Sequence, residues 1–209
     1  MQHFWSQFLH QCITFAAILD PIGASAVMLG MLPHGMTPAE AENIARRSSL
    51  TILIAFIVVF ALGEGVLRFF GINEHSLKVI GGVVLLLMAL EMLGHGRTQM
   101  PISANRREDI AVIPLGIPIL FGAGLFATVI IFRQQAHSLW DVTMTTAAFL
   151  LNTAAVYLAL RYAMQIREML GETGEKVVTK LMGILTGAIA VQFILGGATI
   201  LVLQILNTD

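Results

Sequence analysis

One acidic residue, Asp20, stands inside the first long apolar stretch of the sequence, within the hexapeptide "ILDPIG" at residues 18–23. A carboxylate in an apolar span is costly and usually has a functional reason. Asp followed by Pro is also a helix-start signature, because Asp accepts hydrogen bonds from the first backbone N–H groups and Pro21 fits the first turn. Two interpretations of Asp20 stay open: a helix cap only, or a cap whose charge also changes on binding a proton or a sodium ion.

The sequence "PLGIPILFGAG", at residues 114–124, is a second place where a helix is expected to break. Its prolines, Pro114 and Pro118, remove backbone donors, and we expect a half-helix to restart near Gly122. The start of a helix presents free N–H groups and a positive dipole end, which bind anions such as a carboxylate. Glycines leave room for a small ligand beside the backbone. The predicted substrate-binding residues are those around both breaks: Asp20, Pro21, Ile22, Gly23, Gly122, Ala123 and Gly124.

The composition indicates that the helices expected to carry these residues lie in a membrane. Of 209 residues, 56% are hydrophobic and 12% are charged, whereas a soluble domain carries about 25% charged residues. The net charge of -1 gives no basic face for nucleic acid. Cys12 is the single cysteine, which excludes an intrachain disulfide, and the histidines lack ligand spacing, so we expect no metal and no cofactor.

Apolar stretches of the required length predict an all-α polytopic membrane protein, since a crossing helix needs about 20 apolar residues. The linkers are too short for a second domain, so residues 1–209 form a single transmembrane domain in the lipid bilayer. The polar stretches 33–47, 94–109 and 161–180 fit short loops or surface helices. The first stretch lacks the pattern of a cleaved signal peptide and is read as a retained span. The six predicted spans are residues 4–32, 49–67, 76–95, 110–132, 141–161 and 182–206.

The distribution of Lys and Arg predicts the orientation. One side of the six spans holds only Arg68, Lys78 and Arg133. Cationic loops favour the cytoplasm, so both termini are predicted on the opposite, periplasmic side of a bacterial inner membrane. The nine residues of the cytoplasmic set are Arg46, Arg47, Arg97, Arg106, Arg107, Arg161, Arg167, Lys176 and Lys180.

The two halves of the chain align at an offset of 102, which pairs "KVIGGVVLLLMAL" from Lys78 with "KLMGILTGAIAVQ" from Lys180. The same offset superimposes the two predicted breaks. Three spans in each half force the halves into opposite orientations. This predicts two inverted three-helix repeats, residues 4–95 and 110–207, joined by a cytoplasmic loop at 96–109, with helices 1 and 4 discontinuous, as in many secondary transporters.

Other polar residues give little support for catalysis. A membrane-embedded aspartyl protease needs two carboxylates that share a proton, and Asp20 is the only charged residue deep within a predicted span. We therefore expect no enzymatic activity. Thr128, Asn152 and Thr186 lie in spans and are predicted to hydrogen-bond between helices.

Three motifs resemble the MarC family of bacterial inner-membrane proteins: "LDPIG", "LKVIGGVVLLLMALEML" and "IAVIPLGIPILFGAG". The resemblance covers about residues 10–195. It implies six spans in two inverted triplets and transport of small neutral amino acids such as glycine and alanine. The family motif has Gly-Pro-Gly where this chain has Gly122-Ala123-Gly124, so the second break lacks its proline.

The leading hypothesis is therefore a secondary transporter of small neutral amino acids, with the substrate carboxylate held at half-helix N-termini near the bilayer midplane. The alternative is an efflux or accessory membrane protein for other small solutes, with the same fold and a different pocket. The interpretation leaves open a coupling proton or sodium ion at Asp20 and a homo-oligomeric assembly.

Overall fold

Polar caps determine where several helices begin in the computed structural model, which describes residues 2–31, 37–94, 111 and 115–206. Helix α3 (Pro38–Phe69) follows Thr37, whose hydroxyl accepts the Glu40 N–H at 3.3 Å while the Thr37 N–H donates to the Glu40 carboxylate at 2.8 Å. This reciprocal pair satisfies donors that the first helical turn leaves free. The predicted span at 49–67 is thus the apolar part of a helix that begins at Pro38.

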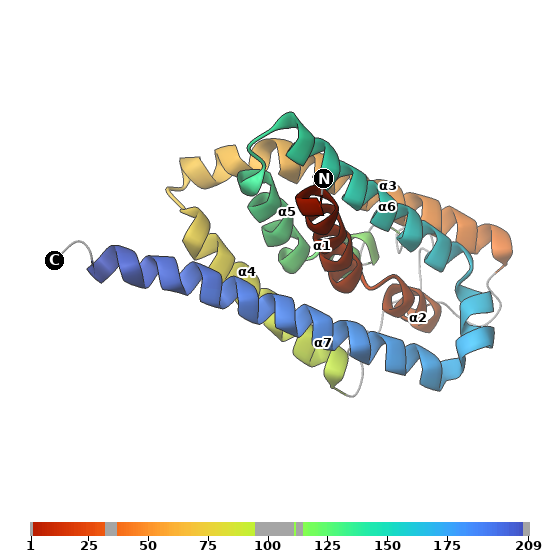
Figure 1. The fold of residues 1–209 in the computed structure, drawn as a ribbon. Helices are drawn as coiled ribbons and strands as arrows, with labels where there is room; N and C mark the ends of the chain where they lie inside the picture. Colours follow the sequence, from red (N-terminus) through yellow and green to blue (C-terminus); the bar gives the residue numbers. More distant parts are fainter. Residues whose placement is uncertain (1, 32–36, 95–110, 112–114, 207–209) are drawn as a thin grey trace.

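The described residues form helices and the turns that join some of them. Figure 1 shows them packed as one bundle, in which α7 lies along α4 and α6 lies along α3. The helices are α1 (Gln2–Leu19), α2 (Pro21–Met31), α3 (Pro38–Phe69), α4 (Glu74–Leu93), a short π-helical segment η2 (Leu115–Leu120), α5 (Ala123–Gln135), α6 (Leu139–Arg161) and α7 (Ala163–Leu206).

Five segments of the described chain are long and apolar enough to cross a membrane, so the protein is an all-helical membrane protein. The predicted fourth span, 110–132, is not among them, because its described residues are divided between η2 and the 13-residue helix α5. The count of six spans therefore stays a prediction. The five segments are Trp5–Met31, Pro38–Phe69, His75–Leu93, Leu139–Arg161 and Ala163–Gln204.

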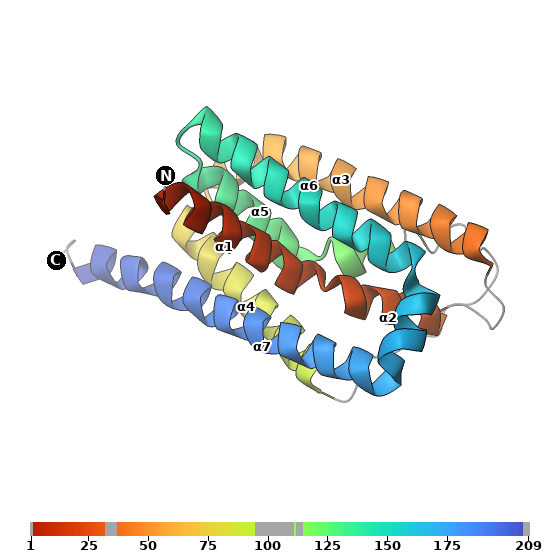
Figure 2. The same ribbon diagram turned by 45° about the vertical axis from the view of Figure 1, so that its right-hand side comes forward.

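The polar stretch 161–180 is predicted to be a short loop or surface helix, and it is helical from Ala163. Its helix joins the sixth predicted span, so α7 continues to Leu206. Gly171 has φ +65°, which interrupts the helical path near one end of the bundle. Glycine adopts this left-handed conformation without the steric cost that a Cβ adds. The residues after Gly171 consequently pack against α2, as the elbow in Figure 2 shows.

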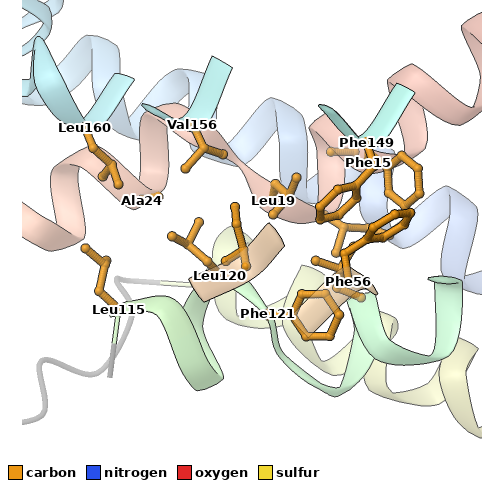
Figure 3. Close-up of a cluster of buried hydrophobic side chains, with 14 of the residues drawn as sticks. Phe15, Leu19, Ala24, Phe56, Leu115, Leu120, Phe121, Phe149, Val156 and Leu160 are labelled. Atoms are coloured by element: carbon orange, nitrogen blue, oxygen red, sulfur yellow. The ribbon is translucent and has the colours of Figure 1, made fainter. Parts of the chain in front are cut away.

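The core is a buried cluster to which α1, α3, α5 and α6 contribute aromatic rings. Phe149 stacks on Phe56 with ring centroids 4.0 Å apart and meets Phe15 edge-on at 5.2 Å. Figure 3 shows these rings beside aliphatic residues from the regions of both helix breaks. Large apolar side chains such as Ile54, Ile57 and Leu62 are exposed on α3. Such outward apolar surface suits lipid contact.

Figure 2 places the start of α1 and the end of α7 at the same end of the bundle, together with the α3–α4 and α5–α6 turns. The topology predicted from the sequence likewise has both termini on one side. Which side of a membrane that end faces stays a prediction from the Lys and Arg distribution.

Candidate functional site

The first break lies where the sequence predicts it. Helix α1 ends at Leu19, α2 begins at Pro21, and Asp20 between them has φ +40°. Asp20 is fully buried, and its Oδ1 accepts the Gly23 N–H at 3.1 Å. Its carbonyl accepts the Ala24 N–H at 2.8 Å, which is the first backbone hydrogen bond of α2. Asp20 is therefore an N-cap, and Asp is one of the few residues that tolerate a left-handed backbone.

Gly23 fits this break because it lacks a side chain. A Cβ at Gly23 would overlap the Asp20 carboxylate and would lie 3.0 Å from the Thr179 hydroxyl of α7. Three groups thus meet in a small buried space: the Asp20 carboxyl, the Gly23 backbone and the Thr179 hydroxyl. Ile22 and Pro21, also predicted to bind substrate, are half-buried.

The second break separates η2 from α5. Ile117 inside η2 has extended dihedral angles of φ -134° and ψ 126°, and Gly122 is extended at φ -87° and ψ -179°. Helix α5 starts at Ala123, with the Phe126 N–H bonded to the Gly122 carbonyl at 3.0 Å. Gly122 provides no side-chain cap. Pro114 lies outside the described residues, and Pro118 lies within η2.

The two breaks occupy corresponding positions in the sequence. Asp20 and Gly122 both precede a helix, and the helix starts Pro21 and Ala123 are 102 residues apart. This is the offset that aligns Lys78 with Lys180. The break near Gly122 forms although Ala123 stands in the position of Pro21.

The two breaks contribute to the same buried cluster. Leu19 and Ala24 flank the first break, Leu120 and Phe121 precede the second, and Figure 3 shows these side chains around one space. The predicted residues themselves have different surroundings.

A Cβ at Gly124 would lie 2.7 Å from Leu85 Cδ2 and 3.0 Å from Met88 Sδ, so the absence of a side chain there serves close packing of α5 on α4. Gly122 is half-buried and Ala123 is exposed. Asp20 and Gly23 are thus the predicted residues that the structure joins by a hydrogen bond.

Two polar side chains hold α1 against its neighbours, as predicted. Thr186 of α7 donates to the Ala17 carbonyl at 2.9 Å, and Asn152 of α6 donates to the Cys12 carbonyl at 3.2 Å. Ala17 is in the last turn of α1, where carbonyls lack helical partners. The prediction for Thr128 is wrong, because its hydroxyl bonds to the Gly124 carbonyl of its own helix, at 2.8 Å.

We expect Thr186→Val to destabilise the protein by about 1 kcal/mol, because the variant leaves the Ala17 carbonyl at the break without its donor. Thermal unfolding of the purified protein in detergent measures this loss. Thr128→Val is the matched control, since it removes a hydroxyl that bonds within one helix. Equal effects of the two substitutions would show that the hydrogen bond between α7 and α1 contributes no more to stability than one within a single helix.

The sequence interpretation missed Glu175. Its side chain is buried, and Asp20 and Glu175 are the two carboxylate residues buried to this degree in the described part of the chain. Glu175 adds a second buried carboxylate, outside the predicted spans, to Asp20 within the first span. The residue was assigned to a polar loop because hydropathy averages over neighbours. The available signal was the spacing of Glu175, Thr179 and Thr186, which places all three on one helical face.

A cavity of about 370 Å³ lies elsewhere, at the end of the bundle that carries the α3–α4 turn. Polar side chains from α3 and α5 line it, including Arg133 and the ion pair of Glu64 with Arg68 at 2.6 Å. None of the predicted site residues lines this cavity. Asp20 at the first break is buried among side chains, and this cavity belongs to a different surface.

The bundle of long apolar helices, two of them interrupted within the fold, defines an integral multi-pass membrane protein. The profile of the MarC family of integral membrane proteins matches residues 5–202. The chain belongs to this family.

Relatives of similar sequence occur in several organisms. A UPF0056 membrane protein of Pyrococcus horikoshii is 34% identical over 184 residues, which cover 87% of this chain and 89% of the relative. A UPF0056 membrane protein of Pyrococcus abyssi is 30% identical over 183 residues, with the same two coverages. The UPF0056 membrane protein YhcE of Escherichia coli is 27% identical over 187 residues, covering 87% and 86% of the two chains. No solved structure matches the chain.

Proposed function

We propose that the protein is a secondary transporter of small neutral amino acids, which moves its substrate by alternating access. The observation that supports this most directly is the pair of helix starts, at Pro21 and Ala123, inside the membrane bundle. Interrupted helices survive at membrane depth only where protein or a cavity covers them, and in transporters they provide substrate sites. The MarC resemblance supports the same substrate class.

The packing of the helices supports the inverted repeat on which alternating access would depend. Under the offset of 102, α2 corresponds to α5, α3 to α6, and α4 to α7. Helix α2 packs against α6 and α7, and α5 packs against α3 and α4. Helix α1 packs against α6, and its counterpart η2 packs against α3. These pairs of neighbours are preserved when the halves are exchanged, as a two-fold relation would require, whereas the contact of α1 with α7 has no counterpart of similar extent between the described residues of η2 and α4.

The two helix starts differ in what they offer a ligand. At α2 the Asp20 carboxylate already accepts the Gly23 N–H, whereas Gly122 offers no side chain to the first N–H groups of α5. Backbone N–H groups and the positive dipole end at α5 therefore provide the better position for a substrate carboxylate. The Asp20 carboxylate occupies the equivalent position at α2. The substrate ammonium group is then attracted to the side of the site that carries the Asp20 charge.

Uptake by proteoliposomes tests the proposal. Purified protein reconstituted into vesicles is expected to exchange radiolabelled glycine, alanine or serine, with competition among the three and none from leucine. Empty vesicles provide the background. Absence of both binding and flux for all three amino acids would refute the proposal, and flux of unrelated small solutes would favour the efflux alternative.

A further inference from the structure

Glu175 is an ionisable side chain that the proposed function does not yet use. It lies on α7, is 6% exposed, and its Oε1 has no hydrogen-bond partner among the described residues. An isolated carboxylate loses much of its hydration when it is buried, which strongly disfavours the charged form. A carboxylate in such a position binds a cation or a proton more readily than a carboxylate at the surface.

The position of Glu175 relates it to the first break. Four residues separate Glu175 from Thr179, which is one turn or about 6 Å along the axis. The Thr179 hydroxyl lies 3.0 Å from the Cβ position of Gly23, and Thr186 on the same face bonds to Ala17. One face of α7 therefore lies along the α1–α2 break and carries the polar side chains of Thr179 and Thr186. Glu175 lies on the same face, one turn before Thr179.

We propose that Glu175 is the proton-binding site of the transporter. The carboxylate takes up one proton from water at one side and becomes a neutral carboxyl group. It then returns the proton to water at the other side, so that no other reactant is consumed. This step rests on the proposed amino acid transport.

Among the described residues, the charged groups that bear on Glu175 lie on α7. On α7 itself, Arg167 and Glu172 act on it electrostatically and oppose each other in sign. Helix α2 has no titratable side chain, and α1 presents Asp20 at its end. On α4, Glu91 is exposed and is not among the groups that act on Glu175.

Helix α6 contributes Arg161, which lies 3.5 Å from Glu42. That cation is thus partnered by a carboxylate of α3. Within the described part of the chain, burial is thus the largest influence on the protonation of Glu175, ahead of Arg167 and Glu172.

Glu175→Gln, which mimics the neutral side chain, tests this assignment in the full-length protein. A pH gradient of one unit supports up to about tenfold accumulation per proton. We expect wild-type vesicles to accumulate alanine in response to this gradient. Glu175→Gln should lose this response while it retains exchange of alanine for alanine. Glu172→Gln is the matched control, because Glu172 is exposed and pairs with Lys176 at 2.7 Å.

Infrared spectra of the purified protein give a readout that does not need transport. The band of a protonated carboxyl group near neutral pH should be lost in Glu175→Gln and retained in Glu172→Gln. Glu175→Asp, which keeps a titratable group, should shift the pH midpoint of uptake.

An unchanged band, an unchanged response to the pH gradient in Glu175→Gln, or accumulation driven by sodium would overturn the assignment. Wild-type vesicles without any amino acid flux would refute the proposed function, and the infrared comparison would still decide whether Glu175 holds a proton.

Discussion

Replacing Gly23 with leucine is expected to abolish transport while the protein still inserts into the membrane. Even the first atom of the new side chain would overlap the Asp20 carboxylate and lie 3.0 Å from the Thr179 hydroxyl. The Asp20 side chain would have to leave the Gly23 N–H, so the cap of α2 is lost together with the space at the break. Displacement of a site by about 1 Å costs roughly 100-fold in rate, and we expect at least this loss. Initial uptake rates in proteoliposomes measure it.

Gly23→Ala separates the effect of size from that of the cap. It should already reduce transport, and it should destabilise the protein by about 1–3 kcal/mol through overpacking. Gly196→Ala on α7 is the control, because a Cβ at Gly196 meets no atom within 4 Å. That variant should transport like the wild type. Normal flux in Gly23→Leu would place the substrate site elsewhere.

Asp20→Ala is expected to lower stability by about 2–3 kcal/mol, for two reasons that add. The loss of an N-cap costs about 1 kcal/mol, and holding alanine in the left-handed region, where Asp20 has φ +40°, costs about 1–2 kcal/mol. Thermal unfolding in detergent and the yield of folded protein check this value. The break between α1 and α2 should loosen, so uptake should fall as well.

Asp20→Asn distinguishes the two interpretations of this residue. Asparagine keeps an oxygen that accepts the Gly23 N–H and tolerates the same backbone, so stability should stay close to that of the wild type. If Asp20 acts as a cap and Glu175 binds the proton, Asp20→Asn should retain the response to a pH gradient. A folded Asp20→Asn variant that exchanges alanine but no longer responds to the gradient would assign the coupling to Asp20.

The helix starts could be predicted because local chemistry determines them. Asp20-Pro21 combines a cap with a residue that suits the first turn, and α2 begins there. Gly122 could be located because the repeat offset carries the first break onto it, and α5 begins at the next residue. Both features depend on a few adjacent residues, so distant contacts were not needed to find them.

Features set by tertiary contacts were harder to predict. Glu175 is buried by the elbow at Gly171, which returns α7 onto α2, and a hydropathy window cannot detect that fold-back. The close packing of Gly124 on Leu85 depends on how α5 packs against α4, which no local sequence pattern reveals. By contrast, Thr37 and Glu40 form a capping box that is visible in the sequence, so the start of α3 within the polar stretch 33–47 is predictable from local chemistry.

The unequal caps at the two breaks have a consequence for the working cycle. An inverted repeat with identical halves would populate its inward-facing and outward-facing states equally, because exchanging the halves converts one state into the other. Here Asp20 caps one break, and Gly122 leaves the other without a side-chain cap. If the protein alternates between two such states as proposed, they differ in energy before any substrate binds, and the empty protein has a preferred resting state. A substrate carboxylate bound at the start of α5 would supply the missing cap. It would shift the populations of the two states by the difference between its binding free energies for them.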